Sequence, residues 1–267
     1  MDILKDCKVA VIVAIMGGSD TLNYKLEPNV PNASMRWALV KELNKAGIWT
    51  GVRWEPIMAG INDKEEVFDD FLHMAQRTGC RHVSFYNYRT SNAWIGKEEF
   101  EKRGYNYVKM LEGNLDENWR PKGKTFVEIA KKYGVKVSSP DFVNFPFDNA
   151  CESCCGTDGL FVPYEFTFQH ACKIILQKGS VCWDDMEEID FRNPEAYERM
   201  KECWNGGKVR VETTGHTSLE GERRLYSLKD SSEIILTGKD KRGYYIYKRR
   251  EEGDKPFDPT YREGMLF

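Results

Sequence analysis

The sequence predicts an α/β fold in which parallel strands alternate with helices over residues 1–140, and three observations support this prediction. Short apolar runs recur along this region, and the first of them, KVAVIVAIM at residues 8–16, is nearly continuous. Such runs are typical of strands that are covered on both faces. Amphipathic stretches follow the runs, and several of these stretches end at a glycine, as at Gly47, Gly79 and Gly134. Strands that alternate with helices form parallel sheets through right-handed crossovers.

Four strand–helix units account for this N-terminal region. The predicted strands cover residues 8–16, 48–57, 81–89 and 135–138. The predicted helices cover residues 34–46, the stretch from a cap at Asn62 or Asp63 to Gly79, a looser region at 97–111, and residues 125–133. Four such units make half of an eight-stranded barrel or a small doubly wound sheet, and the pattern alone does not choose between them.

The character of the sequence changes from about residue 149. A cysteine-rich segment leads into a helix opened by Pro163 and another opened by Asn193-Pro194, because proline is favoured in the first helical turn. Residues 233–236 and 244–248 flank a Gly-Lys-Asp-Lys-Arg-Gly turn and predict a β-hairpin, and a loose tail follows it. The expected organisation is a partial barrel at 1–148, a Cys-rich helical segment at 149–215, and a hairpin with its tail at 216–267.

The composition is typical of a soluble globular protein. The chain is 41% hydrophobic and 30% charged, and its net charge of −3 indicates no general attraction to nucleic acid. No apolar run reaches the roughly 18–20 residues that cross a bilayer. The apolar N-terminal stretch is similar in length to a signal peptide, but Asp2, Asp6 and the lack of a basic n-region argue against one. We therefore expect a cytoplasmic protein with no membrane segment.

Three of the predicted strands have one apolar and one polar face, because successive side chains alternate across a strand. The expected polar faces carry Gly51, Arg53 and Glu55; then His82, Ser84, Tyr86 and Tyr88; and then Lys136 and Ser138. Charged groups inside a covered sheet are costly unless they are paired or bind something. A ligand-holding barrel lumen explains the pattern, and the alternative is an internal Arg53–Glu55 ion pair with tyrosines that seal a packed core. The first strand offers Ala10, Ile12 and Ala14 on one face, and these small groups leave room for a flat ligand.

A family resemblance becomes specific between Thr21 and Asp63. The elements that carry it are Leu26-Glu27-Pro28, Pro31, Arg36, Leu43, Ala46-Gly47-Ile48, Glu55-Pro56-Ile57 and Gly60-Ile61-Asn62-Asp63, followed by the stretch from Thr78-Gly79 to Tyr88. In this order and spacing they resemble radical S-adenosylmethionine proteins of the spore photoproduct lyase-like group. The resemblance covers roughly residues 8–90. It implies that these segments are the fourth to sixth strands of the barrel of that family.

The resemblance also implies a cofactor and an incomplete site. Family members bind S-adenosylmethionine across the carboxyl ends of the strands, and a [4Fe–4S] cluster held by a C-x3-C-x2-C motif ligates its methionine moiety. That motif does not occur in the 267 residues, so the chain resembles a member without its first three strand–helix units. The resemblance implies cofactor contacts at Arg53, Glu55, Gly60 and Ser84, and substrate-side or radical-relay roles for Tyr86 and Tyr88.

Six of the eight cysteines fall within about fifty residues, and Cys151-x-x-Cys154-Cys155-Gly156 is the densest part. In a reducing compartment such a cluster favours metal binding over disulfides. Three thiolates beside a glycine can wrap one metal ion or cluster. The resemblance implies an auxiliary [4Fe–4S] cluster, while structural zinc and buried cysteines without metal are the alternatives. His170 and His216 are isolated and are interpreted as packing residues.

The predicted partners follow from the strand order and the charge runs. If the barrel begins with its fourth strand, the strand at residues 8–16 has an uncovered edge, which predicts a second chain or self-association there. The basic runs 239–242 and 248–250 are either solvated hairpin positions or a nucleic-acid contact, because part of the resembling group acts on DNA lesions.

Three functions are left open by the sequence. The chain is the S-adenosylmethionine- and substrate-binding part of a radical enzyme that needs an N-terminal half, a non-catalytic zinc- or ligand-binding protein on a degenerate barrel, or an inactive gene fragment.

Overall fold

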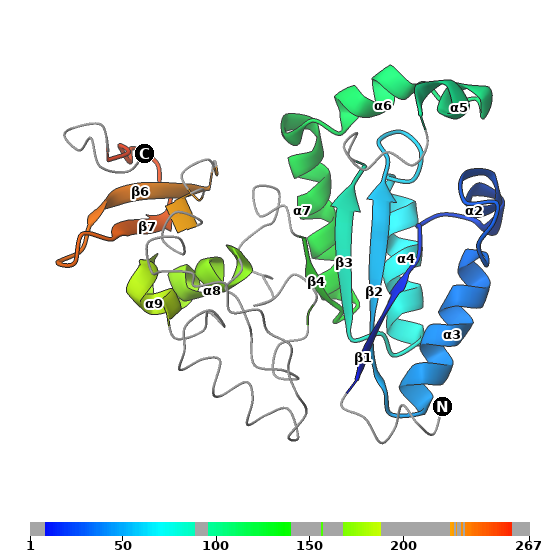
Figure 1. Cartoon of the computed structure of the whole chain (residues 1–267), viewed down its shortest axis with the longest axis horizontal. Coiled ribbons are helices and arrows are strands. Elements are labelled where there is room, and N and C mark those ends of the chain that lie inside the picture. The colour runs from blue at the N-terminus through cyan, green and yellow to red at the C-terminus, as the bar shows by residue number, and fades with distance from the viewer. Residues whose placement is uncertain are drawn as a thin grey trace, which may run out of the picture. The chain divides into compact units, whose positions relative to one another are not determined.

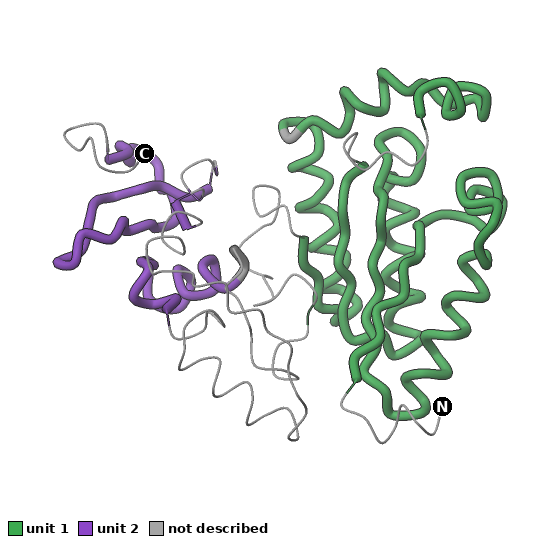
Figure 2. The backbone as a smooth tube through the Cα atoms, viewed as in Figure 1, with its two compact units in different colours: residues 1–160 green, residues 161–267 purple. Residues whose placement is uncertain are grey.

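The computed structural model describes residues 9–88, 96–139, 156, 168–187, 225–226, 228, 231 and 233–257. The chain divides into two compact units, Met1–Leu160 and Phe161–Phe267, which Figure 2 shows in different colours. Unit 1 holds a four-stranded parallel sheet and unit 2 a three-stranded antiparallel sheet. None of the helices in the described ranges combines the length and the apolar character that crossing a membrane requires.

Unit 1 is an α/β unit with its strands in sequential order. The strands are β1 (Ala10–Ala14), β2 (Trp49–Ile57), β3 (His82–Asn87) and β4 (Lys136–Ser138), and they pair in parallel in the order β1-β2-β3-β4. The helices between consecutive strands are α3 (Ala33–Lys45), α4 (Glu65–Arg77) and α7 (Asp116–Lys132). Three right-handed crossovers that each advance by one strand place all three helices on the same face of the sheet. This single winding is the arrangement of a partial (β/α) barrel, whereas a doubly wound sheet reverses its strand order.

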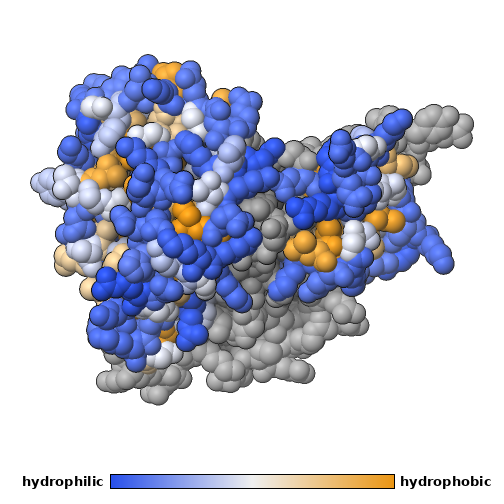
Figure 3. All heavy atoms as spheres, turned by 180° about the vertical axis from the view of Figure 1, so that it is seen from behind, coloured by the Kyte–Doolittle hydropathy of each residue, from blue (hydrophilic) through white to orange (hydrophobic). Residues whose placement is uncertain are grey.

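The core of unit 1 lies between the sheet and these three helices (Figure 1). The side chain of Trp54 is fully buried at its centre. Its ring centroid lies 4.1 Å from that of Phe71 and 5.6 Å from those of Phe68 and Phe126, which belong to α4 and α7. Burial of aromatic rings of this size is a main source of core stability. Seen from behind in Figure 3, the surface is mainly hydrophilic, with separate small apolar patches.

Three shorter helices extend unit 1. They are α2 (Asp20–Leu26), α5 (Lys97–Lys102) and α6 (Tyr107–Gly113). The predicted loose helical region at 97–111 is thus two separate helices. Helix α2 was not predicted, because its seven residues are too few to show a helical period. Helix α7 begins nine residues earlier than the predicted 125–133, since Pro121 and Gly123 are poor helix formers that hide its first turns.

The predicted cap of α4 was wrong. Lys64 occupies the N-cap position, and its side chain makes no capping hydrogen bond. Asn62 and Asp63 instead hold the preceding loop: Asn62 Oδ1 accepts the Met58 N–H at 2.7 Å, and Asp63 Oδ1 accepts the Gly60 N–H at 2.7 Å. Both side chains are buried, so their partners were set by the tertiary structure rather than by the helix.

Unit 2 contains helices α8 (Phe168–Lys178) and α9 (Trp183–Glu187), the short strand β5 (Ser180–Val181), and strands β6 (Ile234–Lys239) and β7 (Tyr245–Arg249). Strands β6 and β7 form the predicted antiparallel hairpin, and β5 pairs with the other side of β7. A register shift follows Leu236, where Gly238 pairs with Ile246. Asn193-Pro194 and Pro163 lie outside the described residues.

Candidate functional site

Mainly small and polar side chains form continuous rows on the face of the parallel sheet opposite α3, α4 and α7. Strand pairing aligns Ala14 with Arg53, Arg53 with Ser84, and Ser84 with Ser138. The row before it contains Ile12, Gly51, His82 and Lys136. The alternate residues pack into the core on the helix side, as Trp54 does. The predicted division of these strands into an apolar and a polar face is therefore confirmed, with the exception of Tyr88.

Lys136 is exposed in these rows, and Arg53 is partly exposed beside Glu55 of the same strand. Arg53 Nη1 lies 3.8 Å from Glu55 Oε2, and the two side chains keep 37% and 35% of their surface exposed. Arg53 Cζ also lies 5.4 Å from the centroid of the Tyr86 ring, within cation–π range. Arg53 Nε is buried and has no hydrogen-bond partner among the described residues. Glu55 and Tyr86 thus flank the guanidinium, and the exposed part of the side chain retains N–H donors for a ligand.

His82, Ser84 and Ser138 form the buried part of the same rows. Each of their side chains is at most 2% exposed. His82 Nε2 and Ser138 Oγ lie 2.8 Å apart and share a hydrogen bond. Burial, and to a lesser extent the charge of Lys136, lowers the pKa of His82 to about 3, so the imidazole is neutral. Ser84 lies on the predicted face, but because it is buried a ligand does not reach it.

Gly156 lies directly against the His82 ring. A Cβ added to Gly156 would be 2.0 Å from His82 Cγ, and the glycine has a φ of +67°. Only a residue without a side chain fits so close to the ring in this conformation. Gly156, the glycine of the Cys-rich motif, therefore packs against the polar face of the sheet at His82.

Tyr88 does not share the polar face with Tyr86, which corrects the expected alternation. It follows the end of β3, and its ring lies 6.2 Å from that of Phe100 and 6.3 Å from that of Tyr107. The side chain is 5% exposed within an apolar cluster that also contains Met16. Burial, together with a hydrogen bond to Tyr107, raises the pKa of Tyr88 to about 12. A register shift between β2 and β3 after Trp54 changes the alternation before this point.

Asn62 and Asp63 stabilise the loop after β2 through side-chain hydrogen bonds that the sequence did not predict. Asn62 Nδ2 donates to the carbonyls of Pro56 at 3.2 Å and Gly17 at 3.3 Å. Asp63 is ion-paired with Lys122 of α7. The predicted contact residue Gly60 is exposed at the tip of this loop with a φ of +76°. The polar residues Asn62 and Asp63 of the Gly-Ile-Asn-Asp stretch were visible in the sequence, but their partners were not.

The predicted metal ligands Cys151, Cys154 and Cys155 lie outside the described residues. Of the other cysteines, Cys80 and Cys172 are buried, and burial raises the pKa of each thiol to about 12. These two therefore behave as small buried hydrophobic residues.

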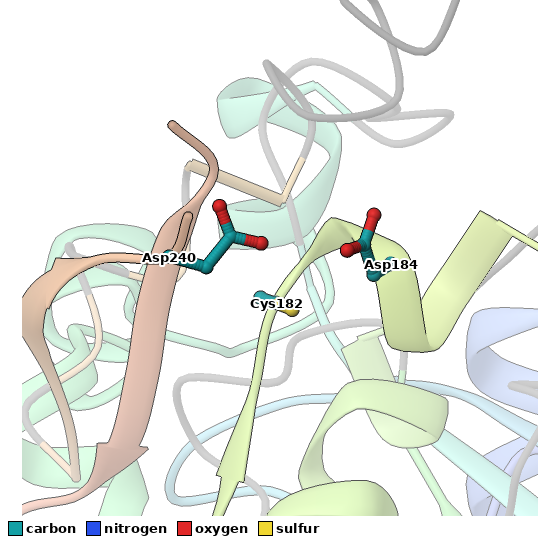
Figure 4. A group of neighbouring side chains, drawn as sticks. All are labelled: Cys182, Asp184 and Asp240. Carbon is teal, nitrogen blue, oxygen red and sulfur yellow. The ribbon is translucent and has the colours of Figure 1, made fainter. Parts of the chain in front are cut away.

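Cys182, Asp184 and Asp240 bring one thiol and two carboxylates within 4.8 Å of one another in unit 2 (Figure 4). These are donor types that zinc accepts. However, Arg242 is ion-paired with Asp184 and lies 3.6 Å from Glu187. Asp240 Oδ1 accepts two backbone N–H groups of the turn between β6 and β7, each at 2.8 Å. These contacts explain the cluster as a link between α9 and the hairpin, and we assign no metal to it.

The basic runs of the hairpin are partly neutralised by carboxylates. Arg242 is paired as described above, and Lys248 Nζ lies 3.0 Å from Asp254 Oδ1. Lys239 Nζ lies 4.9 Å from the centroid of the Tyr245 ring. The nucleic-acid contact stays a prediction.

Comparison with known proteins gives little beyond this geometry. No protein-family model and no curated protein matches the sequence. Among solved structures, a domain of pyruvate-formate lyase-activating enzyme from Bacteroides vulgatus ATCC 8482 is similar over 52% of this chain and 70% of that chain. The TM-score is 0.35 and the sequence identity 10%, which is too low to carry an argument about function.

Proposed function

We propose that the face of the parallel sheet opposite α3, α4 and α7 binds S-adenosylmethionine, and that the chain is the cofactor- and substrate-binding part of a radical enzyme. The proposal rests mainly on one observation: Arg53 and Glu55 form a partly exposed pair of opposite charges, with side chains that are 37% and 35% exposed. The sequence resemblance to radical S-adenosylmethionine proteins supports the choice of ligand.

The donors and acceptors of this pair suit the methionine moiety of the cofactor. A guanidinium binds a carboxylate through two parallel hydrogen bonds, and a carboxylate accepts hydrogen bonds from an ammonium group. Arg53 would hold the carboxylate and Glu55 the ammonium, while Ala14 beside Arg53 leaves space for the ligand. Tyr86 orients Arg53 from the next strand. When bound next to a reduced iron–sulfur cluster, the cofactor supplies one-electron chemistry.

Binding of S-adenosylmethionine to the full chain, measured by isothermal titration calorimetry, tests the proposal. Arg53→Met should weaken binding about tenfold or more, because it removes a charge-assisted hydrogen-bonding group. Arg77→Met is the matched control, since Arg77 is exposed at the end of α4 on the helix side. Equal affinities for the wild type and Arg53→Met, or no binding at all, would contradict the proposal.

Two iron–sulfur clusters are part of this proposal, one held by a second chain and one held by this chain. A second chain would supply the cluster-binding segment and pair with β1, whose only strand neighbour in the described part is β2. Cys151, Cys154 and Cys155 would hold an auxiliary [4Fe–4S] cluster. Anaerobic reconstitution should then give iron and sulfide incorporation that Cys154→Ser abolishes. Stoichiometric zinc in place of iron would favour the alternative, a non-catalytic binding protein on a degenerate barrel.

A further inference from the structure

A cavity on the helix side of the sheet in unit 1 has the features of a second binding site. It has a volume of about 670 Å³ and opens between α2, α3 and α4, next to the segment that follows β1. This volume is within the usual range for small-molecule sites. Side chains from all three helices and from the loop after β2 line the cavity, so no single stretch of sequence predicts it.

The inner wall of this cavity is apolar. Trp37 and Phe71 are 5% and 4% exposed, and their rings meet edge to face with centroids 5.0 Å apart. Met16 and Ala33 also line the cavity and are buried. A ligand with an apolar or aromatic body is therefore favoured here, because its binding removes apolar surface from water.

Asp20 contributes a fixed carboxylate to the lining. This residue is half-buried, its Oδ1 accepts the Ser34 N–H at 3.0 Å, and its Oδ2 accepts the Ser34 hydroxyl at 2.7 Å. Both donors are neutral, so they orient the carboxylate without cancelling its charge. A carboxylate accepts about four hydrogen bonds, so acceptor positions remain for a ligand.

The charged side chains of the lining sum to one negative charge, because they are Asp20, Asp70 and Lys64. Asp70 and Lys64 are exposed, and neither forms an ion pair or a side-chain hydrogen bond with the described residues. The long Lys64 side chain can extend into water, whereas Ser34 holds the Asp20 carboxylate in place. The lining therefore attracts a positively charged ligand and opposes a negatively charged one.

We infer that this cavity binds a primary amine with an apolar or aromatic body. The ammonium group donates hydrogen bonds to the Asp20 carboxylate, and the charge of Asp70 adds to the attraction. The body of the ligand contacts Trp37 and Phe71. The site is independent of the proposed S-adenosylmethionine site, because none of its lining residues belongs to the rows that contain Arg53.

Calorimetric titration of the full chain with indole compounds of similar size tests the inference. Tryptamine carries an ammonium group, tryptophol a neutral hydroxyl, indole-3-propionate a carboxylate, and tryptophan both charges. Tryptamine should bind about fivefold to tenfold more tightly than tryptophol, and indole-3-propionate more weakly than tryptophol. Tryptophan should bind more weakly than tryptamine, because its carboxylate is repelled by those of the cavity.

Asp20→Asn removes the charge and keeps the contact with α3. The asparagine carbonyl still accepts the Ser34 N–H, and its amide can donate to the Ser34 hydroxyl. This variant should weaken tryptamine binding about fivefold to tenfold and change tryptophol binding less than about twofold. Lys64→Met should instead strengthen tryptamine binding about twofold, because it removes the positive charge of the lining.

Glu66→Gln is the matched control, because Glu66 is exposed on α4 and does not line the cavity. It should change none of these affinities. The inference is overturned if tryptamine shows no saturable binding, if any of the other three compounds binds as tightly as tryptamine, or if Asp20→Asn and Glu66→Gln have equal effects. Arg53→Met should leave tryptamine binding unchanged, and Asp20→Asn should leave S-adenosylmethionine binding unchanged, so the two proposals fail separately.

Discussion

His82 Nε2 lies 2.8 Å from Ser138 Oγ, and this hydrogen bond joins β3 to β4 on the face of the sheet opposite α3, α4 and α7. His82 is 2% exposed, so its ring is surrounded by protein atoms instead of water, and the Ser138 hydroxyl is its hydrogen-bond partner. Burial makes the protonated imidazolium unfavourable, which is why the pKa falls to about 3 from an ordinary value of 6.5. The buried position of the ring therefore favours the neutral imidazole.

Stability should therefore fall as the pH decreases below about 6.5. Between pH 6.5 and 3 the unfolded chain binds a proton at His82 and the folded chain does not, so each unit of decrease costs up to about 1.4 kcal/mol. Above pH 6.5 this contribution is fully present. Urea unfolding at pH 7 and pH 5 measures the difference, and His82→Gln should reduce it. The exposed His73→Gln is the control, and an equal reduction in that variant would contradict the assignment.

Gly156→Ala should destabilise unit 1 by more than backbone strain explains. The new methyl group would lie 2.0 Å from His82 Cγ, and the φ of +67° disfavours any side chain. Gly134→Ala has nearly the same φ, +65°, and meets nothing within 4 Å, so it measures the strain alone at about 1 kcal/mol. We expect the Gly156 variant to lose at least about 1 kcal/mol more in chemical denaturation. Equal losses would show that Gly156 does not contact the ring in solution.

The ion pair between Arg36 and Glu27 should stabilise the end of β1. Arg36 Nη2 lies 2.5 Å from Glu27 Oε2, and Arg36 Nη1 donates to the Ala14 carbonyl at 2.9 Å. The two side chains are 11% and 18% exposed, so removing one partner leaves a mostly buried charge. Glu27→Gln should lower the unfolding free energy by about 2 kcal/mol.

The matched control for that variant is Glu42→Gln, which breaks the exposed pair with Lys45 on α3. Exposed pairs contribute little, so we expect no measurable change. A loss in Glu42→Gln as large as that in Glu27→Gln would show that burial of the Arg36 pair is not the cause.

The sequence predicted the strands and their faces because a period of two is a local property. Arg53 and Glu55 could be assigned to one face from their spacing to Trp54 alone. The accessibility of a polar side chain to a ligand is not a local property. Ser84 is buried whereas Arg53 is partly exposed, although both occupy the same row. The place of Tyr88 was missed because a register shift in the neighbouring strand interrupts the alternation.

Helix boundaries were predicted less well where side chains have competing partners. Asn62 and Asp63 have the residue types of a helix cap, but loop amides and Lys122 take their hydrogen-bonding groups instead. The cavity beside Trp37 combines residues from three helices and two loops, and no stretch of sequence places them together.

The free side of β1 should control association of the chain. β1 pairs only with β2 in the described part, and Ile12 in its middle is 37% exposed. An exposed edge with apolar side chains favours pairing with another strand, and a charged side chain on an edge strand disfavours it. We therefore expect the wild-type chain to self-associate in sedimentation velocity, and Ile12→Lys to shift it toward the monomer. Leu39→Lys introduces the same charge at a side chain on α3 that is 49% exposed, and should leave the distribution unchanged. A monomeric wild type, or equal shifts in both variants, would exclude β1 as a surface for self-association.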